Sequence, residues 1–300
     1  MKSYFLLRSC KGILVFALSI VLFELGIAQN VGIGTTSPAA KLEVAGDVRV
    51  NGKISNVTDP LASQDAATKN YVDQLSESML DAGLYGVVID IDGNTYKTIK
   101  IGTQVWMAQN LRTTKYNDGT VIPKVTNNAA WGALTTPAYC WYGNDSTLTA
   151  KLYGALYNNY TVADTNSLNV CPTGWHVPSD AEWTVLSDFL TANGYGFGGG
   201  GDDIGKSLAS TFRWNSSGIV GTIGNDQGTN NSCGFTGLPG GFRSDYGTTF
   251  FSIGFDGFWW SGTEVDSYDA WGRVLDYYSV DLSVEFGNKR FGFSVRCLRD

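Results

Sequence analysis

The stretch Cys171-Pro-Thr-Gly-Trp-His-Val-Pro-Ser-Asp-Ala-Glu-Trp183 decides the fold, because it contains the clearest helix start in the chain. Ser179 stands three residues before Glu182, so each side chain can satisfy a free backbone amide of the first turn. The apolar residues that follow on one helical face are Trp183, Leu186 and Leu190. Gly194 is typical of a helix end. The sequence therefore predicts one amphipathic helix that begins after Ser179.

Short segments typical of strands lie on both sides of this helix, separated by glycine, asparagine and aspartate turns. They are residues 87–91, 95–101, 104–108, 152–158, 258–261 and 292–296. No proline-rich or charged linker interrupts the chain from Tyr85 onward, so residues 85–300 form one predicted unit. We therefore predict the α+β class, with irregular β-structure and one or two helices.

The first 28 residues have the pattern of a secretory signal peptide. Basic residues precede an apolar run from Ile13 to Phe23, and small residues stand before Gln29. The run is shorter than the roughly 18 apolar residues that a membrane helix needs. We therefore expect signal peptide 1–28 and a secreted or cell-surface mature protein with no membrane span.

Residues 29–84 differ in character from the rest and are predicted to form a stalk. Apolar residues from Leu42 to Ile54 keep a nearly period-two spacing across tight turns, which indicates short strands. Farther on, Val72, Leu75 and Met79 follow a-d-a heptad spacing. So short a helix with so narrow a seam needs partners, which predicts self-association; a patterned but flexible linker is the alternative.

A resemblance makes this expectation more specific. Residues 31–38 and 41–48 resemble a repeat of bacterial and phage tail-fibre-like surface proteins, and residues 56–73 resemble the fibre repeat that often follows it. The resemblance implies a shaft-like β and coiled-coil stalk with a short trimerising helix. It therefore implies a homotrimer formed through residues 31–84.

Composition excludes some functions and favours others. The formal charge is -7 and the pI about 4.7, without a dense basic run, so nucleic acid is not expected as a partner. With 37 glycines, 13% aromatic and 16% charged residues, the chain suits a loop-rich extracellular domain. Cysteines remain after the signal peptide at four positions, Cys140, Cys171, Cys233 and Cys297. Disulfides are expected in an oxidising compartment, and three pairings are possible.

Three catalytic or metal-binding interpretations fail on their sequence context. Residues 200–207 match a phosphate-loop pattern, but they follow a helix end rather than a buried strand, so we expect a loop and a short helix. Residues 90–94 lack the spacing of a calcium loop and are predicted to be a turn between strands. The single histidine, His176, is interpreted as structural. We predict no enzyme, no cofactor and no metal site, while calcium bound by separate loops and paired carboxylates for glycoside hydrolysis stay open.

Several motifs together resemble the Fibrobacter succinogenes major paralogous domain over about residues 85–300. They are residues 92–111, 153–159, 171–183, 237–243, 258–264 and 292–300. Members of this family are mostly exported proteins. The domain is in turn similar to the C-type-lectin-like fold of formylglycine-generating enzymes, whose catalytic cysteines have no counterpart here. The resemblance implies a Cys171–Cys297 disulfide and, less directly, a Cys140–Cys233 disulfide.

A tyrosine-rich segment, residues 263–283, suggests where a ligand binds, because tyrosine and serine are adaptable contact residues. In lectin-like variable proteins the corresponding segment forms the binding face; ordinary paired strands are the alternative. The residues predicted to bind are Trp260, Tyr268, Trp271, Arg273, Tyr277 and Tyr278. We therefore expect an adhesin-like surface or secreted protein that recognises a glycan or a protein. An extracellular polysaccharide-acting enzyme and a structural fibre tip without a ligand are the alternatives.

Overall fold

The computed structural model describes residues 31–33, 36–37, 42–44, 49, 85–246 and 249–300. The predicted signal peptide, the predicted trimerising helix and most of the predicted stalk lie outside the described residues. In the N-terminal unit, β1 (Val31–Ile33) pairs in parallel with β2 (Leu42–Val44). The C-terminal unit, described from Tyr85 onward, is referred to below as the module.

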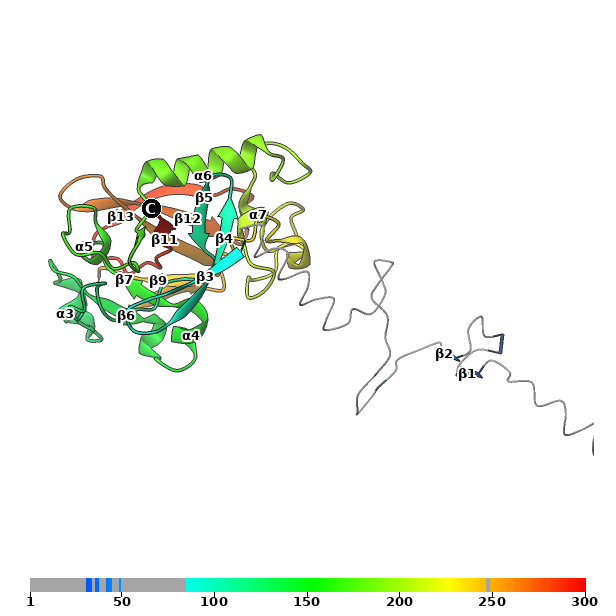
Figure 1. Cartoon of the computed structure of the whole chain (residues 1–300), viewed down its shortest axis with the longest axis horizontal. Helices are drawn as coiled ribbons and strands as arrows, with labels where there is room; N and C mark the ends of the chain where they lie inside the picture. Colours follow the sequence, from blue (N-terminus) through cyan, green and yellow to red (C-terminus); the bar gives the residue numbers. More distant parts are fainter. Residues whose placement is uncertain (1–30, 34–35, 38–41, 45–48, 50–84, 247–248) are drawn as a thin grey trace, which may run out of the picture. The chain divides into compact units, whose positions relative to one another are not determined.

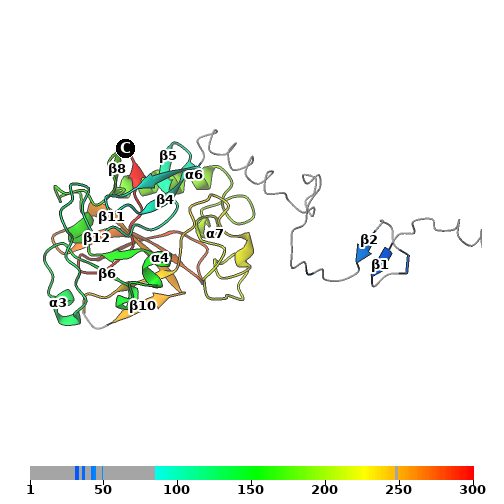
Figure 2. The ribbon, with the colours of Figure 1, turned by 60° about the horizontal axis from the view of Figure 1, so that its bottom comes forward.

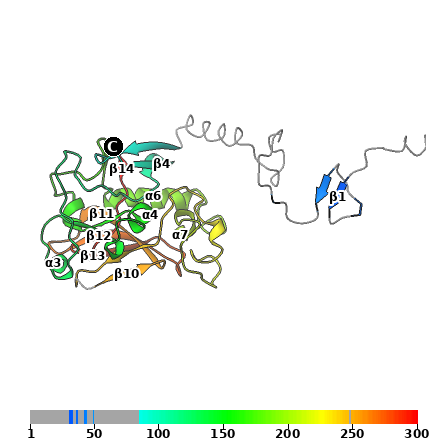
Figure 3. The same ribbon diagram turned by 90° about the horizontal axis from the view of Figure 1, so that it is seen from below.

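Two five-stranded sheets contain most of the strands of the module. The first has the order β3-β4-β5-β14-β8, with β3 (Tyr85–Ile89), β4 (Thr95–Ile101), β5 (Gln104–Met107), β14 (Leu298–Arg299) and β8 (Trp175–His176). The second has the order β10-β9-β11-β12-β13, with β10 (Phe250–Ile253), β9 (Gly240–Arg243), β11 (Asp256–Glu264), β12 (Asp269–Asp276) and β13 (Ser283–Asn288). A small antiparallel pair joins β6 (Tyr139–Trp141) and β7 (Ala155–Tyr157). The two large sheets lie on different sides of the module (Figure 3).

Helices are few among the described residues, and most are short. They are α3 (Asn128–Gly132), α4 (Thr149–Tyr153), α5 (Asn159–Val162), α6 (Asp180–Ala192) and α7 (Gly205–Leu208), with 3-10 turns η1 (Tyr142–Asn144) and η2 (Gln227–Thr229). Helices α3 and α7 lie on opposite sides of the module (Figure 2). A mostly β module with few helices agrees with the predicted α+β class.

Helix α6 begins as the sequence predicts. The Ser179 hydroxyl accepts a hydrogen bond from the Glu182 amide, and the Glu182 carboxylate accepts one from the Ser179 amide at 2.8 Å. Its buried face consists of Trp183, Leu186 and Leu190. Gly194 follows with a φ of 77°, a conformation that ends helices. The long helix packs over the strands on one side of the module (Figure 1).

Two predicted strands differ from the structure. Residues 152–154 belong to α4 and its end, because Gly154 has a φ of 78° and lies against the Leu111 carbonyl, so β7 begins only at Ala155. Residues 292–296 form no continuous strand. Instead, successive residues bridge to three different segments: Gly292 to Arg243, Phe293 to Tyr157 and Ser294 to Trp259.

Strand β11 separates two hydrophobic clusters. Neighbouring residues of a strand point to opposite faces, and accordingly Trp260 packs in a cluster with Tyr157 and Phe293, whereas Trp259 packs in a second cluster with Trp106 and Trp183. Both β11 tryptophans have an exposed fraction of 0%. Their bulky side chains therefore serve the core.

A buried polar network joins the predicted family motifs to one another. The Asn110 carbonyl oxygen accepts hydrogen bonds from Trp259 Nε1 at 2.9 Å and from Arg296 Nε at 2.7 Å. Its amide donates to the Tyr153 carbonyl and to Ser294 Oγ. The Arg296 guanidinium is fully buried, and this burial lowers its pKa to about 9. Its remaining N–H groups donate to the backbone carbonyls of Met107, Phe235 and Thr236.

The disulfide implied by the family resemblance is present, between Cys171 and Cys297. The second implied disulfide is wrong, because Cys140 and Cys233 are both free and buried in different hydrophobic clusters. Burial raises the pKa of each free thiol to about 12, so neither is a thiolate at neutral pH.

Candidate functional site

Two of the six residues predicted to bind ligand are core residues. Trp260 is completely buried and donates a hydrogen bond to the Tyr157 carbonyl. Arg273, with an exposed fraction of 1%, forms an ion pair of 2.7 Å with Asp180 at the start of α6. These side chains hold β11 and β12 to the rest of the module, so in this structure a ligand cannot reach them.

The other four predicted residues do not form one face. Tyr268 and Tyr278 are exposed, but they lie beyond opposite ends of the eight-residue strand β12, which spans roughly 26 Å. Half-buried Trp271 packs edge-on against Phe286 of β13, and Tyr277 packs against Phe255. Of these four residues, Tyr277 and Tyr278 have neighbouring rings, while Tyr268 lies beyond the other end of β12, so the predicted residues do not form one continuous face.

A different part of the module forms a depression of about 620 Å³. Its size lies within the range of small-ligand sites. The lining residues are Asp92, Asn94, Gln109, Arg112, Thr114, Trp141, Ser146, Ala150 and Lys151. None belongs to the predicted binding segment, and we refer to this site as the Arg112 depression.

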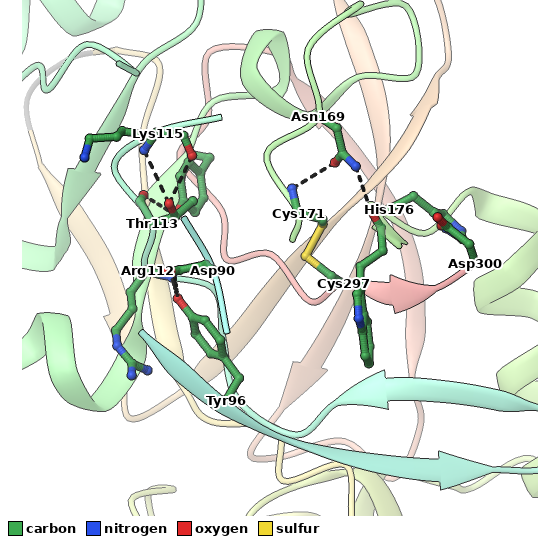
Figure 4. Close-up of a disulfide and its surroundings, with 12 residues drawn as sticks. Asp90, Tyr96, Arg112, Thr113, Lys115, Asn169, Cys171, His176, Cys297 and Asp300 are labelled. Atoms are coloured by element: carbon green, nitrogen blue, oxygen red, sulfur yellow. Dashed lines mark hydrogen bonds and ion pairs between the residues drawn. A yellow bond between two sulfur atoms is a disulfide. The ribbon is translucent and has the colours of Figure 1, made fainter. Parts of the chain in front are cut away.

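The turn between β3 and β4 builds one wall of the depression. The buried Asp90 carboxylate accepts hydrogen bonds from the amides of Asp92 and Asn94 and, at 2.6 Å, from the Tyr96 hydroxyl. That hydroxyl in turn accepts a bond from the Arg112 amide at 3.0 Å. The predicted turn is thus confirmed, and it also places Arg112 beside it (Figure 4).

Arg112 is fixed but incompletely paired. Its Nε donates to Asn94 Oδ1 at 3.2 Å and its Nη2 to the Thr95 carbonyl, while the guanidinium lies 4.6 Å from the Tyr96 ring centroid. No acceptor for Nη1 is found among the described residues. The side chain therefore presents an oriented donor to the depression at little further cost in conformational entropy.

The charges that line the depression favour an anionic ligand group. Partial burial on its own would raise the pKa of Asp92, but hydrogen bonds from Thr114 and an ion pair of 3.0 Å with Lys115 lower it. Asp92 is therefore ionised and already neutralised by Lys115. Lys151 has no acidic partner within the described part of the chain. Arg112 and Lys151 thus leave local positive charge on a chain whose net charge is -7.

The opposite wall comes from β6 and the loop before α4. Trp141 packs mainly in the core, with an exposed fraction of 8%, and the small exposed part of its side chain lines the depression. The Asp145 carboxylate accepts bonds from the amides of Thr147 and Leu148, so the protein itself orders the loop that carries Ser146. This wall therefore combines a small apolar area with an ordered polar loop.

His176 is held between two carboxylates on the other side of the disulfide (Figure 4). Its Nδ1 lies 2.6 Å from Asp300 and its Nε2 2.9 Å from Glu182. Partial burial would lower the pKa of His176, but the bonds to Asp300 and Glu182 outweigh this effect and raise it. The cluster ties the last residue of the sequence to β8 and to the start of α6, which is a structural role.

The phosphate-loop-like stretch also has a structural role. Lys206 lies in the short helix α7, as predicted, and it is buried. Its ammonium donates to the backbone carbonyls of Thr222, Asn225 and Asp226. It is therefore not available to a phosphate.

Neither a membrane-spanning helix nor a metal-binding cluster occurs among the described residues. That part of the chain has no helix whose length and apolarity suffice to traverse a bilayer. Within the same residues, His, Cys, Asp and Glu side chains do not gather in groups of three or more that could hold a metal ion.

The fold and site are those of a mostly β module that contains one disulfide, several buried arginines and an open polar depression. Its sequence also identifies its family. Residues 99–299 match the Fibrobacter succinogenes major domain, and the chain belongs to this family. No curated protein and no solved structure matches the chain. Family membership and the disulfide indicate a surface-associated protein with an extracellular location.

Proposed function

We propose that this is an exported, non-enzymatic surface protein whose module binds an extracellular glycan in the Arg112 depression. One observation carries the proposal: a depression of about 620 Å³ brings together an oriented arginine and a lysine that has no acidic partner among the described residues. We also propose that the module has a C-type-lectin-like fold, that residues 1–28 are a signal peptide and that residues 29–84 form a trimeric stalk.

The chemistry of the lining favours a saccharide that carries carboxylates. Asn94 and Gln109 supply amide groups suited to hydroxyls, and the small exposed part of Trp141 adds apolar surface. The guanidinium of Arg112 and the ammonium of Lys151 suit an acidic substituent, because charge-assisted hydrogen bonds are the stronger ones. A glycan built from uronic acids combines all of these groups.

The lining gives less support to an enzyme that hydrolyses polysaccharides. Glycoside hydrolysis commonly needs two carboxyl groups about 5–9.5 Å apart, one of which is protonated. Among the residues lining the depression, Asp92 is the one carboxylate, and its lowered pKa makes it unsuited to donate a proton. Recognition without bond cleavage is therefore the simpler function for this site.

Calorimetric titration of mature residues 29–300 with oligogalacturonate and with a neutral cello-oligosaccharide tests the proposal. We expect the acidic ligand to bind more tightly, with an affinity that falls as salt rises. Lys151→Gln should weaken acidic binding roughly 10- to 150-fold, since a charge-assisted bond contributes about 1.5–3 kcal/mol, and Lys151→Arg should retain it. Lys124→Gln, which removes an exposed lysine outside the depression, is the matched control.

Three results would count against this function. Equal loss of binding in the Lys124 and Lys151 variants would place the ligand elsewhere. Release of new reducing ends from a bound polysaccharide, abolished by substituting a single acidic residue, would instead support the enzyme. Absence of binding to any glycan by an intact oligomer would support the structural fibre tip.

A further inference from the structure

Strand β3 presents an apolar face that no other described part of the chain covers. Tyr85, Val87 and Ile89 alternate along the strand with exposed fractions of 40%, 67% and 60%. Val88, between them, points the other way and packs against the hydrophobic core. The strand therefore directs apolar residues to both of its faces, which is typical of a strand covered on both sides.

The same strand ends its sheet. In the order β3-β4-β5-β14-β8, β3 pairs only with β4, so its other edge has no strand partner among the described residues. Figure 1 shows these two strands side by side. Sheets normally protect such an edge with charged residues or proline, and Tyr85–Ile89 contains neither. An unprotected edge with an apolar face is the surface expected of an interface.

The sequence just before β3 indicates what covers it. Val72, Leu75 and Met79 follow a-d-a heptad spacing, which predicts a helix that pairs with another helix of the same kind. If such helices associate in parallel, copies of Met79 are expected near one axis. Tyr85 follows six residues later, within at most roughly 20 Å of chain. The β3 strands of the associated copies therefore start close to one another.

We propose that the exposed face of β3, formed by Tyr85, Val87 and Ile89, is a contact surface between copies of this chain. It would extend the association predicted for residues 72–79 into the module. The surface is distinct from the Arg112 depression, so association and glycan binding involve different residues.

The test compares assembly of mature residues 29–300 in the wild type and variants by sedimentation equilibrium. Val87→Glu introduces a charge on the β3 face. Val284→Glu makes the same change at an exposed position of β13, another edge strand, with an exposed fraction of 53%. We expect the wild type and Val284→Glu to assemble equally, and Val87→Glu to raise the dissociation constant at least about tenfold. Circular dichroism, the intact disulfide and unchanged glycan titration would establish that Val87→Glu is folded.

A further variant separates the two parts of the interface. Leu75→Glu should also weaken assembly, because it places a charge at a d position of the predicted helical seam. If Leu75→Glu abolished assembly while Val87→Glu left it unchanged, the helix alone would suffice and the β3 proposal would fall. A wild type that is monomeric throughout, with Val87→Glu lowering only its melting temperature, would show that the chain covers its own β3 face and would also overturn the proposal.

Discussion

Removing the Cys171–Cys297 disulfide should lower the stability of the module substantially, because the bridge closes a long loop. It joins residues separated by 126 positions. In the chain-entropy treatment of the unfolded state, closing a loop of that length contributes about 5 kcal/mol, and measured values for disulfides lie mostly near 2–4 kcal/mol. We therefore expect Cys171→Ala/Cys297→Ala to lose about 3–5 kcal/mol of unfolding free energy beyond the effect of lost side-chain volume.

The two free cysteines provide a control for that volume effect. Cys140→Ala/Cys233→Ala also shortens two buried side chains but leaves the disulfide in place. Urea unfolding of both double variants and of the wild type, with and without dithiothreitol, measures the difference. The reductant should lower wild-type stability toward that of the bridge-deleted variant. If the two double variants differed by less than about 1 kcal/mol, the entropic reasoning would be refuted.

Three further perturbations have expected outcomes. Asn110→Leu leaves the buried Nε of Arg296 without its acceptor and should lower the unfolding free energy by about 2–3 kcal/mol in urea unfolding. Asn110→Asp keeps an acceptor beside that charge and should lower it less. Equal losses in the two variants would contradict the role of this bond. The raised pKa of His176 means that its contribution is complete below the unfolded pKa of about 6.5 and is lost as pH rises through the higher folded pKa. His176→Gln should therefore lose more stability at about pH 5.5 than at about pH 9, and a pH-independent loss would argue against the charged form. Gly154→Ala should lower the melting temperature of the module more than Gly93→Ala does. Both glycines have a positive φ, but a Cβ at Gly154 would lie 2.6 Å from a carbonyl oxygen, whereas a Cβ at Gly93 would meet open space. Similar melting temperatures for the two variants would contradict the clash.

The predicted helix and most strands could be found from sequence because their signals are local. Ser179 and Glu182 cap each other within one turn, and the period of the apolar face needs no distant information. The segment 292–296 could not be assigned in this way. It has the composition of a strand, yet its partners Arg243, Tyr157 and Trp259 come from three separate parts of the chain.

The burial of the predicted binding residues could not be read from the sequence, because composition does not show whether a side chain points into the core or toward solvent. Trp260 and Arg273 stand among turn and tyrosine residues, but the pleat of β11 and β12 points them inward. The Arg112 depression could not be predicted because its residues are distant from one another in the sequence. Its walls are two segments more than 25 residues apart in sequence, around Arg112 and Lys151, and no short-range spacing links them. The one local signal was the Asp90–Asn94 segment, which predicted a turn between strands but not that Arg112 lies beside this turn.

The motifs that identify the family mainly encode the scaffold. Asn110, Trp259 and Arg296 come from three different motifs and meet in one buried network. Asn110 accepts a hydrogen bond from each of the other two residues, so the three motifs stabilise one another in the core. Recognising the family therefore establishes the fold without identifying the ligand.

The position of β14 has a consequence for the timing of folding. Its two residues, Leu298 and Arg299, lie between β5 and β8 in the first sheet, and the adjacent Cys297 closes the disulfide. Both strand partners of β14, and Cys171, precede it in the chain, so the first sheet and the disulfide cannot close until residues 297–299 have been synthesised. Residues 85–296 on their own would therefore lack the strand that lies between β5 and β8 in this sheet, and late closure of the sheet is expected to be a slow, non-local step of folding.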